Sequence, residues 1–167
     1  HGLHQVGGAT GLVHEGAGTV GAGTLKILQE NAEVIAARSG RAVAVTAVSM
    51  RDPSKQREVK MDGIRVEKDA RALASAADVD LVAEVIGGDS GIAKEVVEQA
   101  LANGKHVVTA NKALVAKHGE ALALLAEKNN VVLAFEAAVA GGIPIIGALR
   151  SGLAANRVTR VAGILNG

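Results

Sequence analysis

The stretch "HVVTANKALV", residues 106–115, joins two kinds of sequence and thereby indicates the class of fold. Its first half has the apolar, β-branched run of a buried strand, and its second half has the composition of a helix. Asn111 and Lys112 stand at the join. A strand that leads directly into a helix is the repeating unit of an α/β fold, whose parallel strands are connected by right-handed crossovers.

Strand and helix patterns alternate along the rest of the chain. Helical patterns cover residues 18–40, 91–104, 112–130 and 143–156, and strand patterns cover 42–50, 79–88, 105–110, 131–139 and 157–167. The polar, turn-rich segment 51–69 is expected to be surface loop with a short edge strand at 64–66. The predicted fold is α/β, with a Rossmann-type doubly wound and mainly parallel sheet, so ligands should bind outside the carboxyl ends of the strands.

The composition favours a soluble globular domain. Of the 167 residues 49% are hydrophobic but only 1% are aromatic, which leaves almost no side chain for stacking on bases. The 18 basic and 17 acidic residues are interspersed, so neither nucleic acid nor a membrane surface is an expected partner. The chain has no cysteine, which excludes zinc–cysteine sites and is compatible with the cytoplasm. No apolar run reaches the roughly 18 residues of a membrane span.

The first candidate site is the glycine-rich segment "GAGTVG", in which Gly16, Gly18 and Gly21 have the GxGxxG spacing. Glycines at these positions permit a tight turn and let the backbone approach a pyrophosphate at the start of a helix. The alternative is that they serve only the turn and its packing. We favour dinucleotide binding because the segment opens a helix within an alternating pattern.

Two later strand-to-helix joins extend this interpretation. Arg51 follows the second strand, where an arginine can pair with a 2′-phosphate, and this favours NADP with NAD as the alternative. A solvated turn would also explain Arg51. Gly87 and Gly88 end another predicted strand and would let a flat ring or a ribose lie against the backbone.

Lys112 is unusual because it begins a helix, where the dipole disfavours a cation and no acid neighbours it in sequence. A ligand that is anionic or carries a carbonyl group would explain this lysine better than stability does. The alternative is a lysine that simply reaches solvent.

Four longer motifs resemble the homoserine dehydrogenases. They are "KHVVTANKALVAKHG" at 105–119, "AFEAAVAGGIPII" at 134–146, "LRSGLAANR" at 149–157 and "GILNG" at 163–167. The resemblance implies reduction of L-aspartate 4-semialdehyde, a small-molecule substrate, to L-homoserine with NADPH or NADH. It also implies an NAD(P)-binding Rossmann domain over residues 1–140, followed over 141–167 by the truncated start of a dimerisation and substrate domain. In the full-length protein a homodimer or homotetramer is expected.

The resemblance assigns roles by position. Lys112 matches a lysine beside the nicotinamide and the substrate, where an ammonium would stabilise an alkoxide and help to supply its proton, while the principal proton donor is a second lysine further along the family's chain. The implied cofactor-binding residues are Gly16, Ala17, Gly18, Thr19, Val20, Gly21, Arg51, Gly87, Gly88, Thr109, Asn111 and Lys112.

The resemblance also implies a site for a monovalent cation such as sodium. Its ligands would be Glu136 and backbone carbonyls around Val139, Gly141 and Ile143. Oxygen ligands suit such a hard cation. The alternative is that Glu136 caps the glycine turn that follows it.

The chain departs from the family in two places. His14 and Glu15 stand where apolar or small residues are expected, and the Glu15 carboxylate would repel a pyrophosphate. Family members also continue beyond "NG" into the substrate domain, so these 167 residues are expected to bind cofactor without catalysing the reaction. An NADP-binding module or sensor and a dihydrodipicolinate-reductase-like enzyme remain as alternative functions.

Overall fold

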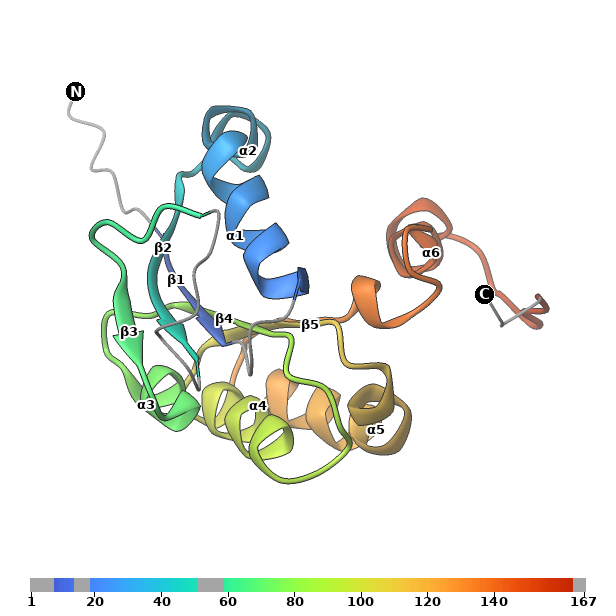
Figure 1. Ribbon diagram of the computed structural model, residues 1–167. Helices are drawn as coiled ribbons and strands as arrows, with labels where there is room; N and C mark the ends of the chain where they lie inside the picture. Colours follow the sequence, from blue (N-terminus) through green and yellow to red (C-terminus); the bar gives the residue numbers. More distant parts are fainter. Residues whose placement is uncertain (1–7, 14–18, 51–58, 164–167) are drawn as a thin grey trace.

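The computed structural model describes residues 8–13, 19–50 and 59–163, and they form a parallel sheet with helices on both faces (Figure 1). The strands are β1 Gly8–Val13, β2 Val43–Ser49, β3 Arg65–Glu67, β4 Leu81–Glu84, β5 His106–Thr109 and β6 Leu133–Ala134. The helices are α1 Thr19–Glu30, α2 Ala32–Ser39, α3 Ala70–Ser75, α4 Ile92–Ala102, α5 Lys112–Lys128 and α6 Ile145–Gly147, with a 3₁₀ turn at Glu136–Ala138 and a π-helical turn at Ala148–Gly152.

The sheet has the order β3-β2-β1-β4-β5-β6, and each neighbouring pair of strands is parallel. This confirms the predicted Rossmann-type doubly wound fold. The direction of winding reverses between β1 and β4, which is where such sheets bind their ligands. Val13, Glu84 and Thr109 are in register across β1, β4 and β5, so the carboxyl ends of the three strands lie level with one another.

Two clusters of buried side chains hold the helices against the sheet. α1 and α2 cover one face, whereas α3, α4 and α5 pack side by side on the other (Figure 1). The larger cluster belongs to the second face and centres on Leu73, Val82, Val97, Leu101 and Leu114, all of them inaccessible to solvent. The smaller cluster, beneath α1, contains Leu25, Val48 and Met50.

Several boundaries differ from the sequence-based expectations. The single helix expected over residues 18–40 is divided at Asn31 into α1 and α2. The Asn31 backbone keeps its helical hydrogen bonds, to the Ile27 carbonyl and from the Ile35 N–H, and its side-chain amide adds a second bond to the Ile27 carbonyl. The six-residue helix α3 was not anticipated, because it is too short for a clear periodicity. β4 ends at Glu84 rather than at residue 88, because Gly87 and Gly88 adopt positive φ angles of 86° and 85° that no strand accommodates.

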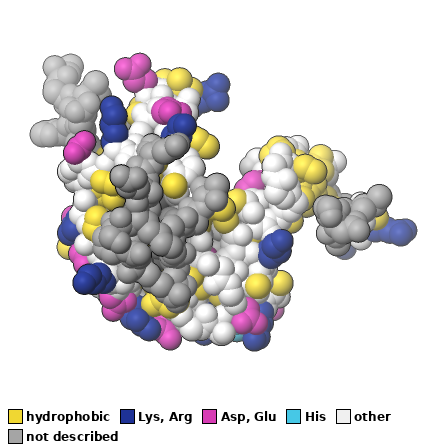
Figure 2. All heavy atoms as spheres, viewed as in Figure 1, with side chains coloured by type: hydrophobic (Ala, Val, Ile, Leu, Met, Phe, Trp, Pro, Cys, Tyr) yellow, Lys and Arg dark blue, Asp and Glu magenta, His cyan; other side chains and the backbone are white. Residues whose placement is uncertain are grey.

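The C-terminal part of the chain leaves the sheet after β6. The strand expected over 131–139 is reduced to Leu133–Ala134 and continues as the 3₁₀ turn, and the strand expected over 157–167 is absent from its described residues, 157–163. No residue from 134 to 163 is buried, and Ile143 and Val161 are more than 60% exposed. Figure 2 shows hydrophobic side chains gathered on this segment, whereas charges of both signs are dispersed over the rest of the visible face. Among the described helices none is long and apolar enough to cross a membrane.

Candidate cofactor-binding site

A buried carboxylate marks the carboxyl edge of the sheet at the point where the winding reverses. Glu84 is the last residue of β4, and its side chain is completely inaccessible to solvent. A buried charge is tolerated only when it is well hydrogen-bonded. Glu84 was not singled out in the sequence, although an acid within the otherwise apolar run "LVAEVIGG" was the available signal.

One oxygen of this carboxylate organises the turn that follows β4. Oε1 of Glu84 accepts hydrogen bonds from the backbone N–H groups of Ile86, at 2.6 Å, and Gly87, at 3.2 Å. Gly87 and Gly88 both lie in the left-handed region, which a side chain would strain. Two consecutive glycines are therefore needed for the conformation of this turn. Because glycine has no side chain, the backbone of the turn is also left uncovered.

The other oxygen of Glu84 connects this turn to the neighbouring strand. The Thr109 hydroxyl donates to Oε2 of Glu84 at 2.5 Å and accepts from the backbone N–H of Asn111 at 3.0 Å. Asn111 then returns to the glycine turn, because its side-chain amide donates to the Gly88 carbonyl at 2.6 Å. Four predicted cofactor residues, Gly87, Gly88, Thr109 and Asn111, are thus brought together around Glu84.

Asn111 also fixes the start of the next helix. Its side-chain oxygen accepts from the backbone N–H of Leu114 at 3.1 Å, which is a standard N-cap for α5. Lys112 is the first residue of that helix and is exposed. No described residue forms a hydrogen bond or an ion pair with the Lys112 ammonium. The cation therefore stands at the carboxyl edge of the sheet without a described protein partner.

The glycine turn is anchored to α5 on its far side as well. Lys117 donates to the Asp89 carboxylate at 3.0 Å, and Nε2 of His118 donates to the Asp89 carbonyl oxygen at the same distance. The hydrogen bond from Lys117, followed by one from Ser90, lowers the pKa of Asp89 below its ordinary value. Asp89 thus remains ionised and bound to α5 over a wider pH range.

The remaining predicted cofactor residues lie partly outside the described residues. The predicted cofactor residues outside the described part of the chain are Gly16, Ala17, Gly18 and Arg51. Glu15, which departs from the family pattern, also lies outside it. Thr19, Val20 and Gly21 form the first turn of α1. β1 ends at Val13, so the glycine-rich segment occupies the connection between a strand and a helix, which is the context that the motif requires.

Glu136, the predicted cation ligand, has a structural partner. Its two carboxylate oxygens accept from the backbone N–H groups of Ile146, at 2.9 Å, and Gly147, at 2.7 Å, so Glu136 caps the first turn of α6. Glu136 is therefore a capping residue, although it caps α6 and not the glycine turn that directly follows it. Among the described residues no group of three His, Cys, Asp or Glu side chains could hold a metal, so a cation at Glu136 would need backbone carbonyls, including those predicted at Val139, Gly141 and Ile143.

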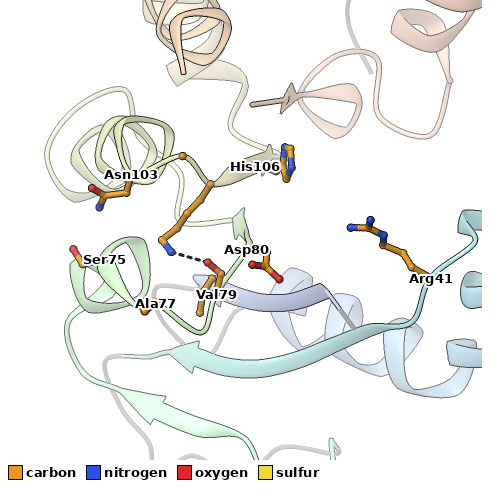
Figure 3. A pocket seen from close by; sticks show the side chains of 9 residues that line it. Arg41, Ser75, Ala77, Val79, Asp80, Asn103 and His106 are labelled. Atoms are coloured by element: carbon orange, nitrogen blue, oxygen red, sulfur yellow. Dashed lines mark hydrogen bonds between the residues drawn. The ribbon is translucent and has the colours of Figure 1, made fainter. Parts of the chain in front are cut away.

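A hollow of about 610 Å³ lies at the opposite, amino-terminal edge of the sheet (Figure 3). It is large enough for a small ligand. However, the Lys105 ammonium is buried and already donates to the carbonyls of Ala76 and Val79, at 2.5 and 2.6 Å. The side-chain amide of Asn103 likewise donates to the Ala74 carbonyl. Since these groups serve the fold, we place the candidate site at the carboxyl edge.

Comparison with known proteins agrees with this geometry. Residues 16–136 match the family model described as the homoserine dehydrogenase NAD-binding domain. The chain belongs to the homoserine dehydrogenase family. The matched segment begins at the glycine motif and ends at Glu136, so it includes every part of the carboxyl-edge site. The resemblance found in the sequence is thereby confirmed, and a nicotinamide dinucleotide is the class of cofactor that this domain binds.

Individual homoserine dehydrogenases support the assignment. One from Neisseria gonorrhoeae is 52% identical over 152 residues, which cover 91% of this chain and 34% of that protein. One from Corynebacterium glutamicum is 47% identical over 161 residues, or 96% of this chain and 36% of that protein. The crystal structure of a homoserine dehydrogenase from Thiobacillus denitrificans superimposes with a TM-score of 0.78 and 44% identity, covering 92% of this chain and 35% of that one. This chain therefore spans about a third of the length of these relatives.

Proposed function

We propose that this chain is the cofactor-binding part of an enzyme that reduces L-aspartate 4-semialdehyde to L-homoserine with NADPH or NADH. The observation that carries the proposal is the match of residues 16–136 to the NAD-binding domain of the homoserine dehydrogenases. The position of the Glu84 network at the reversal of the sheet supports it, because that is where Rossmann-type sheets bind dinucleotides.

The backbone around the glycine turn fits a flat ring. A Cβ placed on Gly87 or Gly88 would meet no heavy atom of a described residue within 4 Å, so the space over both glycines is open. We place the nicotinamide against this turn, with Thr109 and Asn111 shaping the adjoining wall. The segment Gly16–Gly21, with Ala17, Gly18, Thr19 and Val20, would hold the pyrophosphate at the start of α1.

The residues of the site would supply polarisation and orientation. When bound, a reduced nicotinamide cofactor supplies a hydride to the aldehyde carbon of the substrate. As the carbonyl electron pair moves onto the substrate oxygen, the Lys112 ammonium would stabilise the resulting negative charge and help to supply its proton. The absence of a described partner for this ammonium supports that role.

Arg51 gives the proposal a cofactor preference. An arginine can form paired, charge-assisted hydrogen bonds with a 2′-phosphate, which NADP carries and NAD lacks. We therefore propose NADP as the preferred cofactor. Replacing Arg51 by alanine should weaken NADPH binding and leave NADH binding nearly unchanged. Equal affinities for the two cofactors, unaltered in Arg51→Ala, would contradict the preference.

The proposal also covers the rest of the protein. We place the boundary between the cofactor domain, residues 1–140, and the start of a dimerisation and substrate domain, residues 141–167, shortly after the chain leaves the sheet at the end of β6. The exposed apolar side chains beyond Gly142 support this boundary and a homodimer or homotetramer. A monovalent cation at Glu136, Val139, Gly141 and Ile143, and a cytoplasmic location, are further parts of the proposal.

The test is an assay for oxidation of NADPH or NADH that depends on aspartate semialdehyde, monitored at the absorbance of the reduced ring. It uses this chain extended to the length of its relatives, together with the 167-residue chain in a direct binding assay. We expect turnover from the extended protein and cofactor binding by both. Cofactor binding by the extended protein without turnover of the semialdehyde would instead support a sensor or a different oxidoreductase.

A further inference from the structure

The stability of β4 does not explain why an acid stands at Glu84. Its side chain is wholly buried, yet three donors converge on it, namely the N–H groups of Ile86 and Gly87 and the hydroxyl of Thr109. An apolar residue would pack in this position without any need for partners, as Val82 does two residues earlier in the same strand. The acid therefore requires another explanation.

The contacts of Glu84 form a closed ring of hydrogen bonds. From Glu84 the ring passes through the glycine turn to the Gly88 carbonyl, which accepts from the Asn111 side chain. The backbone N–H of Asn111 then donates to the Thr109 hydroxyl, which donates back to the carboxylate. It therefore joins two segments more than 20 residues apart in sequence. One segment is the glycine turn, and the other leads directly into Lys112.

We infer that Glu84 is a positioning residue, whose carboxylate sets the separation between the Gly87–Gly88 turn and the Asn111–Lys112 join. This inference rests on the proposed function, because it assumes that the nicotinamide ring lies against the turn. Glu84 is inaccessible to solvent and so acts through the groups that it holds. If the ring of hydrogen bonds changes its geometry, the nicotinamide half of the cofactor loses its fit, whereas the distant adenosine half keeps its contacts.

Glutamine distinguishes the carboxylate from the volume of the side chain. Glu84→Gln keeps the shape but presents an amide in place of one oxygen. If the amide faces Thr109, it donates to the hydroxyl oxygen that already accepts from Asn111, and the hydroxyl proton loses its acceptor. Thr109→Val interrupts the same link from the other side at nearly constant volume.

The experiment compares two ligands that differ in the nicotinamide half. The dissociation constants of NADPH and of 2′-phospho-ADP-ribose, which lacks the ring, are measured by titration calorimetry on the 167-residue chain. We expect Glu84→Gln and Thr109→Val each to raise the Kd of NADPH about tenfold and that of the ring-less ligand by less than about twofold. In the double variant the Kd of NADPH should exceed that of the more affected single variant by no more than about twofold. Both changes break the same hydrogen bond, between Glu84 and Thr109.

The matched control is Glu95→Gln, which makes the same chemical change in an exposed pair with Arg71 and should alter neither constant. Equal weakening of both ligands in Glu84→Gln, or no weakening of either, would overturn the inference while leaving the proposed function intact. If Glu84→Gln does not fold, the result for Thr109→Val decides in the same way. Failure of the wild-type chain to bind NADPH and NADH would overturn the proposed function, and the inference with it.

Discussion

Lys112 is expected to act in opposite directions on stability and on turnover. It is an exposed cation at the first position of α5, where the helix dipole is unfavourable and no described residue pairs with it. Lys112→Met removes the charge and keeps most of the length of the side chain. The free energy of unfolding should therefore rise by about 0.3–1 kcal/mol, the usual size of a charge–dipole interaction at a helix end.

The same helix offers a matched control at its other end. Lys128 lies in the last turn of α5, is also exposed, and there interacts favourably with the dipole. Lys128→Met should therefore lower the free energy of unfolding by about the same 0.3–1 kcal/mol. Urea unfolding of the two variants, at low ionic strength so that screening does not remove the effect, measures both signs.

Turnover separates the two lysines further. In the chain extended to the length of its relatives, Lys112→Met should reduce kcat by about 10²–10³-fold, the usual loss when a group that stabilises a developing oxyanion is removed, with a much smaller change in cofactor affinity. Lys128→Met should leave kcat unchanged. A Lys112→Met variant that is less stable than wild type and turns over normally would refute the reasoning, because Lys112 would then be a structural residue.

Two further predictions concern the contacts of the glycine turn. Asn111→Ala should lower the free energy of unfolding by about 2–3 kcal/mol, because it removes both the cap of α5 and the hydrogen bond to the Gly88 carbonyl. Asn111→Asp should lower the free energy of unfolding by about 1 kcal/mol less than Asn111→Ala does, because its carboxylate still caps α5. Equal losses in urea unfolding would show that the cap contributes nothing. Lys117→Met should raise the pKa of Asp89 toward its ordinary value in an NMR titration, since the hydrogen bond from Lys117 is the largest cause of its lowering. Because the pKa is depressed in the folded state, the stability difference between the variant and wild type should be present at neutral pH and vanish as the pH falls through the folded pKa of Asp89; a difference that persists at that acidity would contradict it.

Local patterns predicted the elements that carry the candidate site. The helix expected from Lys112 begins at that residue, and the strand expected over 105–110 is observed as His106–Thr109. Both were predictable because hydrophobic periodicity and capping act over a few neighbouring residues. The glycines at 87 and 88 were expected within the end of a strand, whereas they form a left-handed turn after it, a conformation that glycine adopts at little cost.

Contacts between distant segments could not be predicted in this way. The division of the helical segment at Asn31 coincides with a side-chain hydrogen bond to the Ile27 carbonyl, which periodicity does not encode. The ring of hydrogen bonds around Glu84 was still less predictable from local sequence. Glu84 and Thr109 are 25 positions apart and meet only when β4 and β5 pair in the observed register. A shift of one residue would turn their side chains to opposite faces of the sheet.

The sequence alone thus determined the fold class, the family, and the residue types at each strand-to-helix join, because these depend on local pattern and on long motifs. The tertiary structure alone decided the strand order, and with it the reversal between β1 and β4 that brings the joins to one edge. It also revealed Glu84 as the common partner of two joins. The physical reason is that a buried carboxylate must find its donors in space, and those donors come from backbone and side chains that only the paired strands bring within hydrogen-bonding distance.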